Sequence, residues 1–150
     1  MSEILMTPRF ALPLLAVAQA QKEVTHNEAL TLIDALVHAA VEAGPLNDPS
    51  ADPEPGRCWL VGATPTGDWA GQTNAIAIWT VGGWRFIAPR AGMTVVRLAD
   101  GVRLRFDEGE WSWPATIVAP SGGSTTDVEA RSALSALILH LEAQGLLISG

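Results

Sequence analysis

The residues that could do chemistry in this chain are few, and they form no catalytic pattern. His26, His38 and His140 all fall in segments of helical periodicity, and none makes the four-residue spacing of a helical metal pair. Cys58 is the only cysteine, which excludes an internal disulfide and a two-cysteine metal site. We expect it in or beside a strand as a small hydrophobe.

Other reactive motifs are also missing. Residues 122–124 (Gly-Gly-Ser) precede a predicted helix, but they lack the preceding strand and the lysine of a phosphate loop. No nucleophile elbow is present. The sequence therefore predicts a protein that is not an enzyme and that has no metal site and no cofactor.

One acidic loop contains several side chains with oxygen atoms that could bind a calcium ion. Asn47, Asp48, Asp52 and Glu54 lie in residues 44–56, together with four prolines. The spacing is not that of an EF-hand, and the prolines restrict convergence of the side chains on one ion. A solvated acidic linker is the favoured interpretation.

Charge and the lengths of the apolar stretches argue against two classes of partner. The chain carries 16 acidic and 9 basic residues, a net charge of −7, and Lys22 is its only lysine. A nucleic-acid binder needs a positive footprint, so we expect no nucleic-acid partner. No apolar stretch approaches the roughly 20 residues that span a bilayer, so no membrane partner is expected. Residues 9–20 resemble a signal peptide, but Pro13 interrupts the apolar run and the basic region is weak, so secretion is disfavoured.

The composition favours buried subunit surfaces. Hydrophobic residues make up 48% of the chain and charged residues only 17%. A compact core explains part of this excess. Low charge and apolar flanks are also typical of obligate interfaces between subunits.

The elements that must position these residues begin with a helix over residues 25–43. Thr25 and Glu28 have the spacing of a capping box, and Gly44-Pro45 is a stop signal. Apolar residues form two stripes on this helix, which predicts that it is covered on two sides. The first stripe comprises Leu30, Ile33, Val37, Ala40 and Val41, and the second comprises Leu32, Leu36 and Ala39.

A tryptophan-rich β unit is predicted over residues 57–114. All six tryptophans of the chain lie in it, at positions 59, 69, 79, 84, 111 and 113. Trp79, Trp84, Trp111 and Trp113 are expected in its core. Trp69, near Gln72 in a loop, could stack on a sugar, although closure of one end of the core is the favoured interpretation.

Three turn signals set the expected strand register. A two-residue turn at Gly82-Gly83 would place Val81 opposite Trp84 and Trp79 opposite Phe86, with all four on one face. A turn at Asp100-Gly101 would place Val95 opposite Phe106 and Arg97 opposite Leu104. A turn at Glu108-Gly109 would place Phe106 opposite Trp111 and Leu104 opposite Trp113. The inner face of this meander is then Val95, Val102, Leu104, Phe106, Trp111 and Trp113.

A second helix is expected over residues 125–148. A capping box spans Thr126 to Glu129, and Gly145 ends an apolar stripe that includes Leu134, Leu137 and Leu141. The apolar residues 146–148 should be docked against something. The predicted fold class is α+β: an N-terminal arm and helix (1–44), an antiparallel β meander (57–114) and a C-terminal helix (125–148), with linkers at 44–56 and 115–124.

Three segments resemble a domain of unknown function found in tailed phages and in the phage-like gene transfer agents of alphaproteobacteria. The resemblance covers roughly residues 7–114 and is most specific in the Gln-Lys-x-x-Thr-x-Asn-Glu core at Gln21 to Glu28. The similar segments are residues 10–13 with 19–30, residues 66–71 with 76–79, and residues 83–92. In such proteins the domain lies at the base of spikes or fibres.

The resemblance implies a structural component of a phage-like particle, assembled in the bacterial cytoplasm. Its expected partners are further copies of itself, as a pentamer or trimer, a capsid or tail protein, and a spike or fibre protein. The expected interface residues are Leu30, Ile33, Val37, Val41, Leu134, Leu137 and Leu141. The alternative is a carbohydrate-binding module for a bacterial surface glycan, with Trp69 and Gln72 as its contacts.

Overall fold

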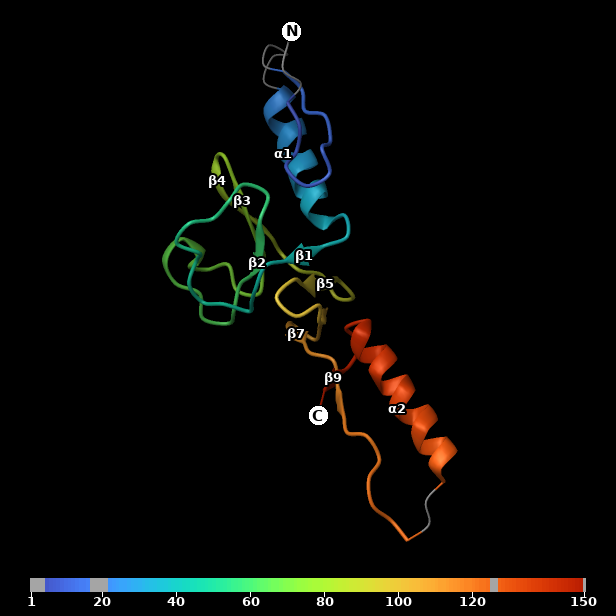
Figure 1. The fold of residues 1–150 in the computed structure, drawn as a ribbon. Helices are drawn as coiled ribbons and strands as arrows, with labels where there is room; N and C mark the ends of the chain where they lie inside the picture. The colour runs from blue at the N-terminus through green and yellow to red at the C-terminus, as the bar shows by residue number, and fades with distance from the viewer. Residues whose placement is uncertain (1–4, 17–21, 125–126, 150) are drawn as a thin grey trace. The chain divides into compact units, whose positions relative to one another are not determined.

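The computed structural model describes residues 5–16, 22–124 and 127–149 (Figure 1). The chain divides into two compact units, Met1–Pro89 and Arg90–Gly150, which we describe separately. Helices stand near both ends of the chain and strands lie between them, so the predicted α+β class is confirmed. The division after Pro89 falls inside the β unit predicted over residues 57–114.

The first unit contains one long helix and a three-stranded antiparallel sheet. The sheet has the order β2-β3-β4. The elements of the first unit are α1 (Lys22–Leu36), β1 (Ala40–Val41), β2 (Cys58–Leu60), the 3-10 helix η1 (Gly67–Trp69), β3 (Ile76–Thr80) and β4 (Gly83–Ile87).

Helix α1 is displaced towards the N-terminus from the predicted range of 25–43. It begins at Lys22, before the predicted cap at Thr25, and ends at Leu36. His38 then takes a φ of 47°, which stops the helix, and Val41 belongs to β1. The guanidinium of Arg9 donates to the carbonyls of Asp34, Ala35 and His38 at 2.7–3.2 Å, so it satisfies carbonyls at the helix end.

The β3–β4 hairpin turns one residue earlier than predicted. Thr80 pairs with Gly83 and Trp79 with Trp84, so Val81 and Gly82 form the turn. The Thr80 hydroxyl selects this register, because it accepts from the Gly82 N–H at 3.2 Å and donates to the Gly83 carbonyl at 2.6 Å. Val81, expected on the aromatic face, is instead 96% exposed.

An aromatic cluster fills one face of this sheet. Trp84 is its centre, with ring-centroid distances of 5.5 Å to Trp59, 5.2 Å to Trp69 and 5.0 Å to Trp79. All three contacts are edge-to-face, with interplanar angles of 64–83°, an arrangement favoured by the aromatic quadrupole. Trp59 and Trp69 are buried, and Trp79, Trp84 and Phe86 pack partly buried against them.

The second unit contains an antiparallel meander and a helix, α2, that lies in the sequence between the two paired strands β8 and β9. Strands β5, β6 and β7 pair antiparallel in chain order, and β8 pairs parallel with β9. Its elements are β5 (Thr94–Arg97), β6 (Arg103–Asp107), β7 (Glu110–Ser112), β8 (Thr116–Ile117), α2 (Val128–Ala143) and β9 (Ile148–Ser149).

The faces of the meander are those predicted, although one register differs. Phe106 lies opposite Trp111, as the turn at Glu108-Gly109 predicts. Val95 lies opposite Leu104 rather than Phe106, because the first turn is two residues longer. A slip of two residues keeps every side chain on its face. Val95, Val102, Leu104 and Trp111 are buried, whereas Trp113, expected in the core, is 44% exposed.

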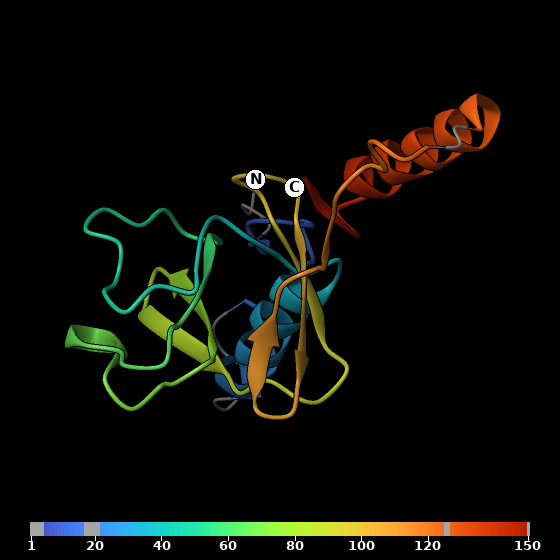
Figure 2. The same ribbon diagram turned by 90° about the horizontal axis from the view of Figure 1, so that it is seen from below.

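Helix α2 begins and ends within the second unit. Asp127 is its N-cap and accepts from the Ala130 N–H at 2.8 Å; the predicted cap, Thr126, lies outside the described residues. At the other end the Gly145 carbonyl accepts from the Arg103 N–H at 3.0 Å. Leu147 is buried next to β9, so part of the apolar end docks in its own unit. Figure 2 shows α2 extending away from the β5–β6–β7 meander.

We predict that Gly145→Ala destabilises the second unit more than a comparable glycine change does. Gly145 has a φ of +68°, and a Cβ there would lie 2.2 Å from the Gly101 carbonyl oxygen. Gly109→Ala is the matched control, since Gly109 has a φ of +91° with nothing within 4 Å of its Cβ. The left-handed backbone costs both variants about 1–2 kcal/mol, and only Gly145→Ala adds the collision. Urea unfolding with equal losses for the two variants would contradict this packing.

Candidate functional site

Helix α2 is the largest unpartnered apolar element of the described chain. It has 16 residues and none of them is buried. Val128, Leu134, Leu137 and Leu139 are 49–67% exposed. A helix that is apolar on several sides is normally covered by other protein.

The face of α2 that lies closest to its own unit is a different one. The partly buried positions follow helical spacing and comprise Arg131, Ser135, Ile138, Leu141 and Glu142. Of the predicted interface residues, Leu141 is therefore partly covered, whereas Leu134 and Leu137 remain accessible. These two positions form the centre of the candidate interface.

The predicted interface residues of the first unit are not brought together on one helix face. Leu30 is partly buried on α1, Ile33 is 48% exposed there, and Val37 follows the helix at 41% exposure. Val41 is only 1% exposed and belongs to β1, so its inclusion in a subunit interface was wrong. The error follows from the helix ending before His38.

The predicted sugar contacts are also incompatible with this conformation. Trp69 is fully buried, and its ring meets the ring of Trp84 at 83°. Gln72 is partly buried, and its backbone N–H donates to the Trp69 carbonyl at 3.0 Å. Trp69 closes the aromatic core and offers no ring face to a saccharide. The alternative in which Trp69 contacts a glycan is therefore not compatible with this conformation.

A clamp on α1 holds residues 5–15, and the sequence analysis missed it. The buried Asp34 carboxylate accepts from the Thr7 hydroxyl at 2.7 Å and from the Arg9 and Phe10 N–H groups at 2.9 and 2.8 Å. The Asn27 side chain accepts from the Leu15 N–H and donates to the Leu15 carbonyl. The available signal was Asp34 among the mainly apolar residues of the second half of α1, because a buried carboxylate must find donors.

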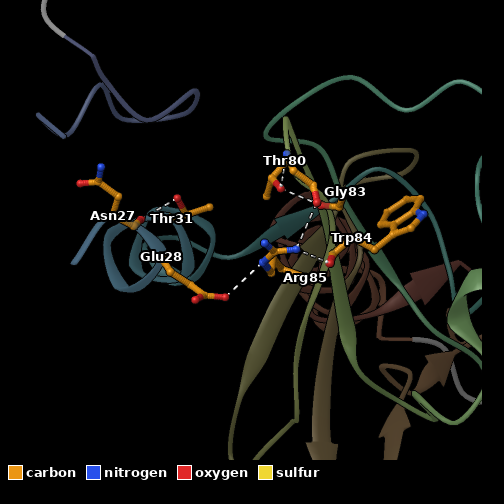
Figure 3. A network of polar contacts seen from close by, with 8 residues as sticks. Asn27, Glu28, Thr31, Thr80, Gly83, Trp84 and Arg85 are labelled. Carbon is orange, nitrogen blue, oxygen red and sulfur yellow. Dashed lines mark hydrogen bonds and ion pairs between the residues drawn. The ribbon is translucent and has the colours of Figure 1, made fainter. Parts of the chain in front are cut away.

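Helix α1 is joined to the β3–β4 hairpin by an ion pair (Figure 3). Arg85 Nε lies 3.1 Å from a carboxylate oxygen of Glu28, and both side chains are about half exposed. Arg85 Nη1 also donates to the carbonyl of Trp84 at 3.0 Å. Glu28 and Arg85 come from two separate segments of the resemblance, which therefore meet in space.

Two adjoining hollows lie between α1 and the hairpin. A mostly apolar cavity of about 210 Å³ separates residues 6–9 and Asp34 from Ile78 and Trp79. A second hollow of about 200 Å³ is lined by Val24, Glu28 and Arg85 among others. Their common lining residues are Thr31, Thr80 and Gly82.

Two kinds of reactive site, a metal cluster and an activated thiol, are absent from the described residues. No cluster of three His, Cys, Asp or Glu side chains that could hold a metal ion occurs among them. Burial raises the pKa of the Cys58 thiol from its ordinary value of 9.0 to about 11, so it is a poor nucleophile at neutral pH. In the part of the chain that the structure describes, no helix is long and apolar enough to cross a membrane.

We predict that Asp34→Asn loosens residues 5–15. The variant keeps the size of the side chain but places an NH₂ group against an N–H or hydroxyl donor, at a cost of about 1–3 kcal/mol. Faster hydrogen exchange at the Arg9 and Phe10 amides would report the change. Asp52→Asn, on an exposed loop of the same unit, is the control, and unchanged exchange in Asp34→Asn would show that the clamp is not needed.

Cys58 should make the stability of the first unit fall at alkaline pH. Between pH 9.0 and about 11 the unfolded thiol loses its proton while the folded thiol keeps it, so ionisation favours unfolding in this range. Below the unfolded pKa the contribution is fully present. We expect the free energy of unfolding of the wild type, measured against Cys58→Ala, to decline across this range. A constant difference would contradict the effect of burial.

One protein family matches the chain. The family model described as "Protein of unknown function (DUF2793)" matches residues 26–112, more than half of the chain. The matched range runs from within α1 to the end of β7 and excludes α2. No curated protein matches the sequence. The predicted likeness to a domain of unknown function is thus confirmed, and its link with spikes and fibres stays a prediction.

Proposed function

We propose that this chain, which belongs to the DUF2793 family, is a structural subunit that self-associates and attaches a spike or fibre to a phage-like particle. The observation that carries the proposal is the exposure of α2. Leu134 and Leu137 are 49% and 55% exposed on a helix without a buried residue. Such a surface is suited to binding protein and has no group for catalysis.

Burial of this surface would supply the free energy of assembly. Complete burial of a leucine side chain contributes about 1.5–3 kcal/mol, and Leu134 and Leu137 retain about half of their surface for this purpose. Because a closed ring repeats one contact at every interface, modest gains at α2 are multiplied over a trimer or pentamer. Capsid or tail protein and the spike or fibre are the further partners.

The range of the family match supports separate roles for the β-rich part of the chain and for α2. Residues 26–112 contain the aromatic cluster and the β5–β6–β7 meander, whereas α2 follows at Val128–Ala143. The matched part therefore has buried aromatic and aliphatic residues of its own. The exposed apolar helix lies outside that part, as expected for an assembly element added to a common domain.

The exposure of the tryptophans disfavours the glycan-binding alternative. A glycan module needs at least two accessible aromatic rings beside polar side chains. All six tryptophans lie in described residues, and Trp113 alone is exposed. The Arg97 guanidinium covers its ring at 4.1 Å from the centroid. The first candidate, a structural subunit, is the one we retain.

We predict that Leu134→Asp prevents assembly without unfolding the chain. The side chain is half exposed, so the charge is tolerated in the free subunit but costs free energy once the face is covered. Ser132→Asp is the matched control, since it adds the same charge at an exposed position on another side of α2. Mass in solution and incorporation into particles are the measurements. Normal assembly of Leu134→Asp, or equal loss in both variants, would refute the proposed interface.

A further inference from the structure

Strand β4 ends the β2-β3-β4 sheet with an edge that no strand among the described residues of the first unit covers. In an antiparallel pair, alternate residues direct their N–H and C=O groups to the partner strand. Thr80 and Gly83 close the two-residue turn, so Arg85 and Ile87 face β3 in the same way as Gly83 does. Trp84 and Phe86 therefore direct their N–H and C=O groups away from β3.

The hydrogen bonds of Trp79 support this assignment. Trp79, opposite Trp84, donates its N–H to the Arg57 carbonyl at 3.0 Å and accepts from the Gly56 N–H at 2.8 Å, on the side away from β4. The same alternation places the Trp84 carbonyl on the free edge. An uncovered edge of this kind is a template for pairing with another chain.

Arg85 lies across this edge. Its Nη1 donates to the outward carbonyl of Trp84 at 3.0 Å and to the carbonyl of Gly82 at 3.4 Å. Its Nε is held by Glu28 at 3.1 Å, and Figure 3 shows Trp84 and Arg85 on opposite sides of β4. One side chain thus occupies a backbone acceptor of the edge, and α1 fixes its position.

We propose that Arg85, fixed by Glu28, is an edge guard that prevents β4 from pairing with β4 of a second copy of this chain. The sequence of β4, Gly-Trp-Arg-Phe-Ile, contains one charge among apolar residues. In an antiparallel pairing of two copies centred on Arg85, the two guanidinium groups would lie directly opposite each other. Like charges in that position destabilise a sheet.

Arg85 has two effects on the edge, and replacing Arg85 removes both. Without Arg85 the Trp84 carbonyl becomes available to a donor, and the repulsion between copies disappears. The remaining strand would be wholly apolar, which is the composition of an aggregation-prone edge. The β4 edge and Leu134 belong to different units of the chain, so edge pairing and assembly through Leu134 are tested by different substitutions.

The test compares Arg85→Ala with Arg57→Ala in the full chain carrying Leu134→Asp, which removes the proposed α2 contact. Arg57 is the matched control, because it is an exposed arginine of the same unit with ion pairs to Glu42 and Glu54. Association is measured by sedimentation, and edge pairing by hydrogen exchange at the Trp84 and Phe86 amides. We expect Arg85→Ala to raise the association constant at least roughly fivefold and to protect both amides.

Glu28→Gln provides a second variant that leaves the sheet intact. It frees Arg85 from α1 but keeps its charge, so we expect association between that of the wild type and that of Arg85→Ala. Association of Arg85→Ala no greater than that of Arg57→Ala overturns the proposal. Association without protection of the Trp84 and Phe86 amides overturns it as well, because the copies would then meet elsewhere. If Arg85→Ala does not fold, an unchanged association constant in Glu28→Gln overturns it.

Discussion

The buried carboxylate of Asp34 organises the N-terminal part of the first unit. Three donors, from Thr7, Arg9 and Phe10, converge on this one carboxylate. Residues 5–15 are thereby held against α1, and together they line one side of the cavity that Ile78 and Trp79 line on the other. Arg9 then satisfies the carbonyls at the end of α1, so one short loop both binds the helix and ends it.

The two faces of the β2-β3-β4 sheet carry different side chains. On one face Trp84 packs against three other indole rings, and burial of apolar area dominates. Alternation along the strands places Leu60, Ile76 and Ile78 on the other face, where all three are buried. Arg85 lies on that second face and forms the ion pair with Glu28 of α1. Adjacent residues of one strand, Trp84 and Arg85, therefore take part in an aromatic cluster and in an ion pair, respectively.

Local patterns predicted the elements well, and they failed where one side-chain hydrogen bond, near in the sequence or far from it, decides the outcome. The turn at Glu108-Gly109 and the inner face of the meander follow from alternation alone. The hairpin after β3 does not, because Gly82-Gly83 and Val81-Gly82 are both acceptable turns and the Thr80 hydroxyl selects the second. The end of α1 depends on Arg9, about 25 residues away in the sequence, which no local motif reveals. The same limit placed Val41 on a helix face. Trp69, by contrast, closes one end of the core, as the favoured interpretation of the sequence expects.

The pairing of β8 with β9 has a consequence for how this chain could change over time. Thr116 lies opposite Ile148, so the excursion through α2 leaves and rejoins the unit at nearly the same point. A segment with adjacent ends can be lengthened, shortened or exchanged while the strands before it keep their connections. The helix can in this sense be exchanged for another segment without rebuilding the strands that precede it.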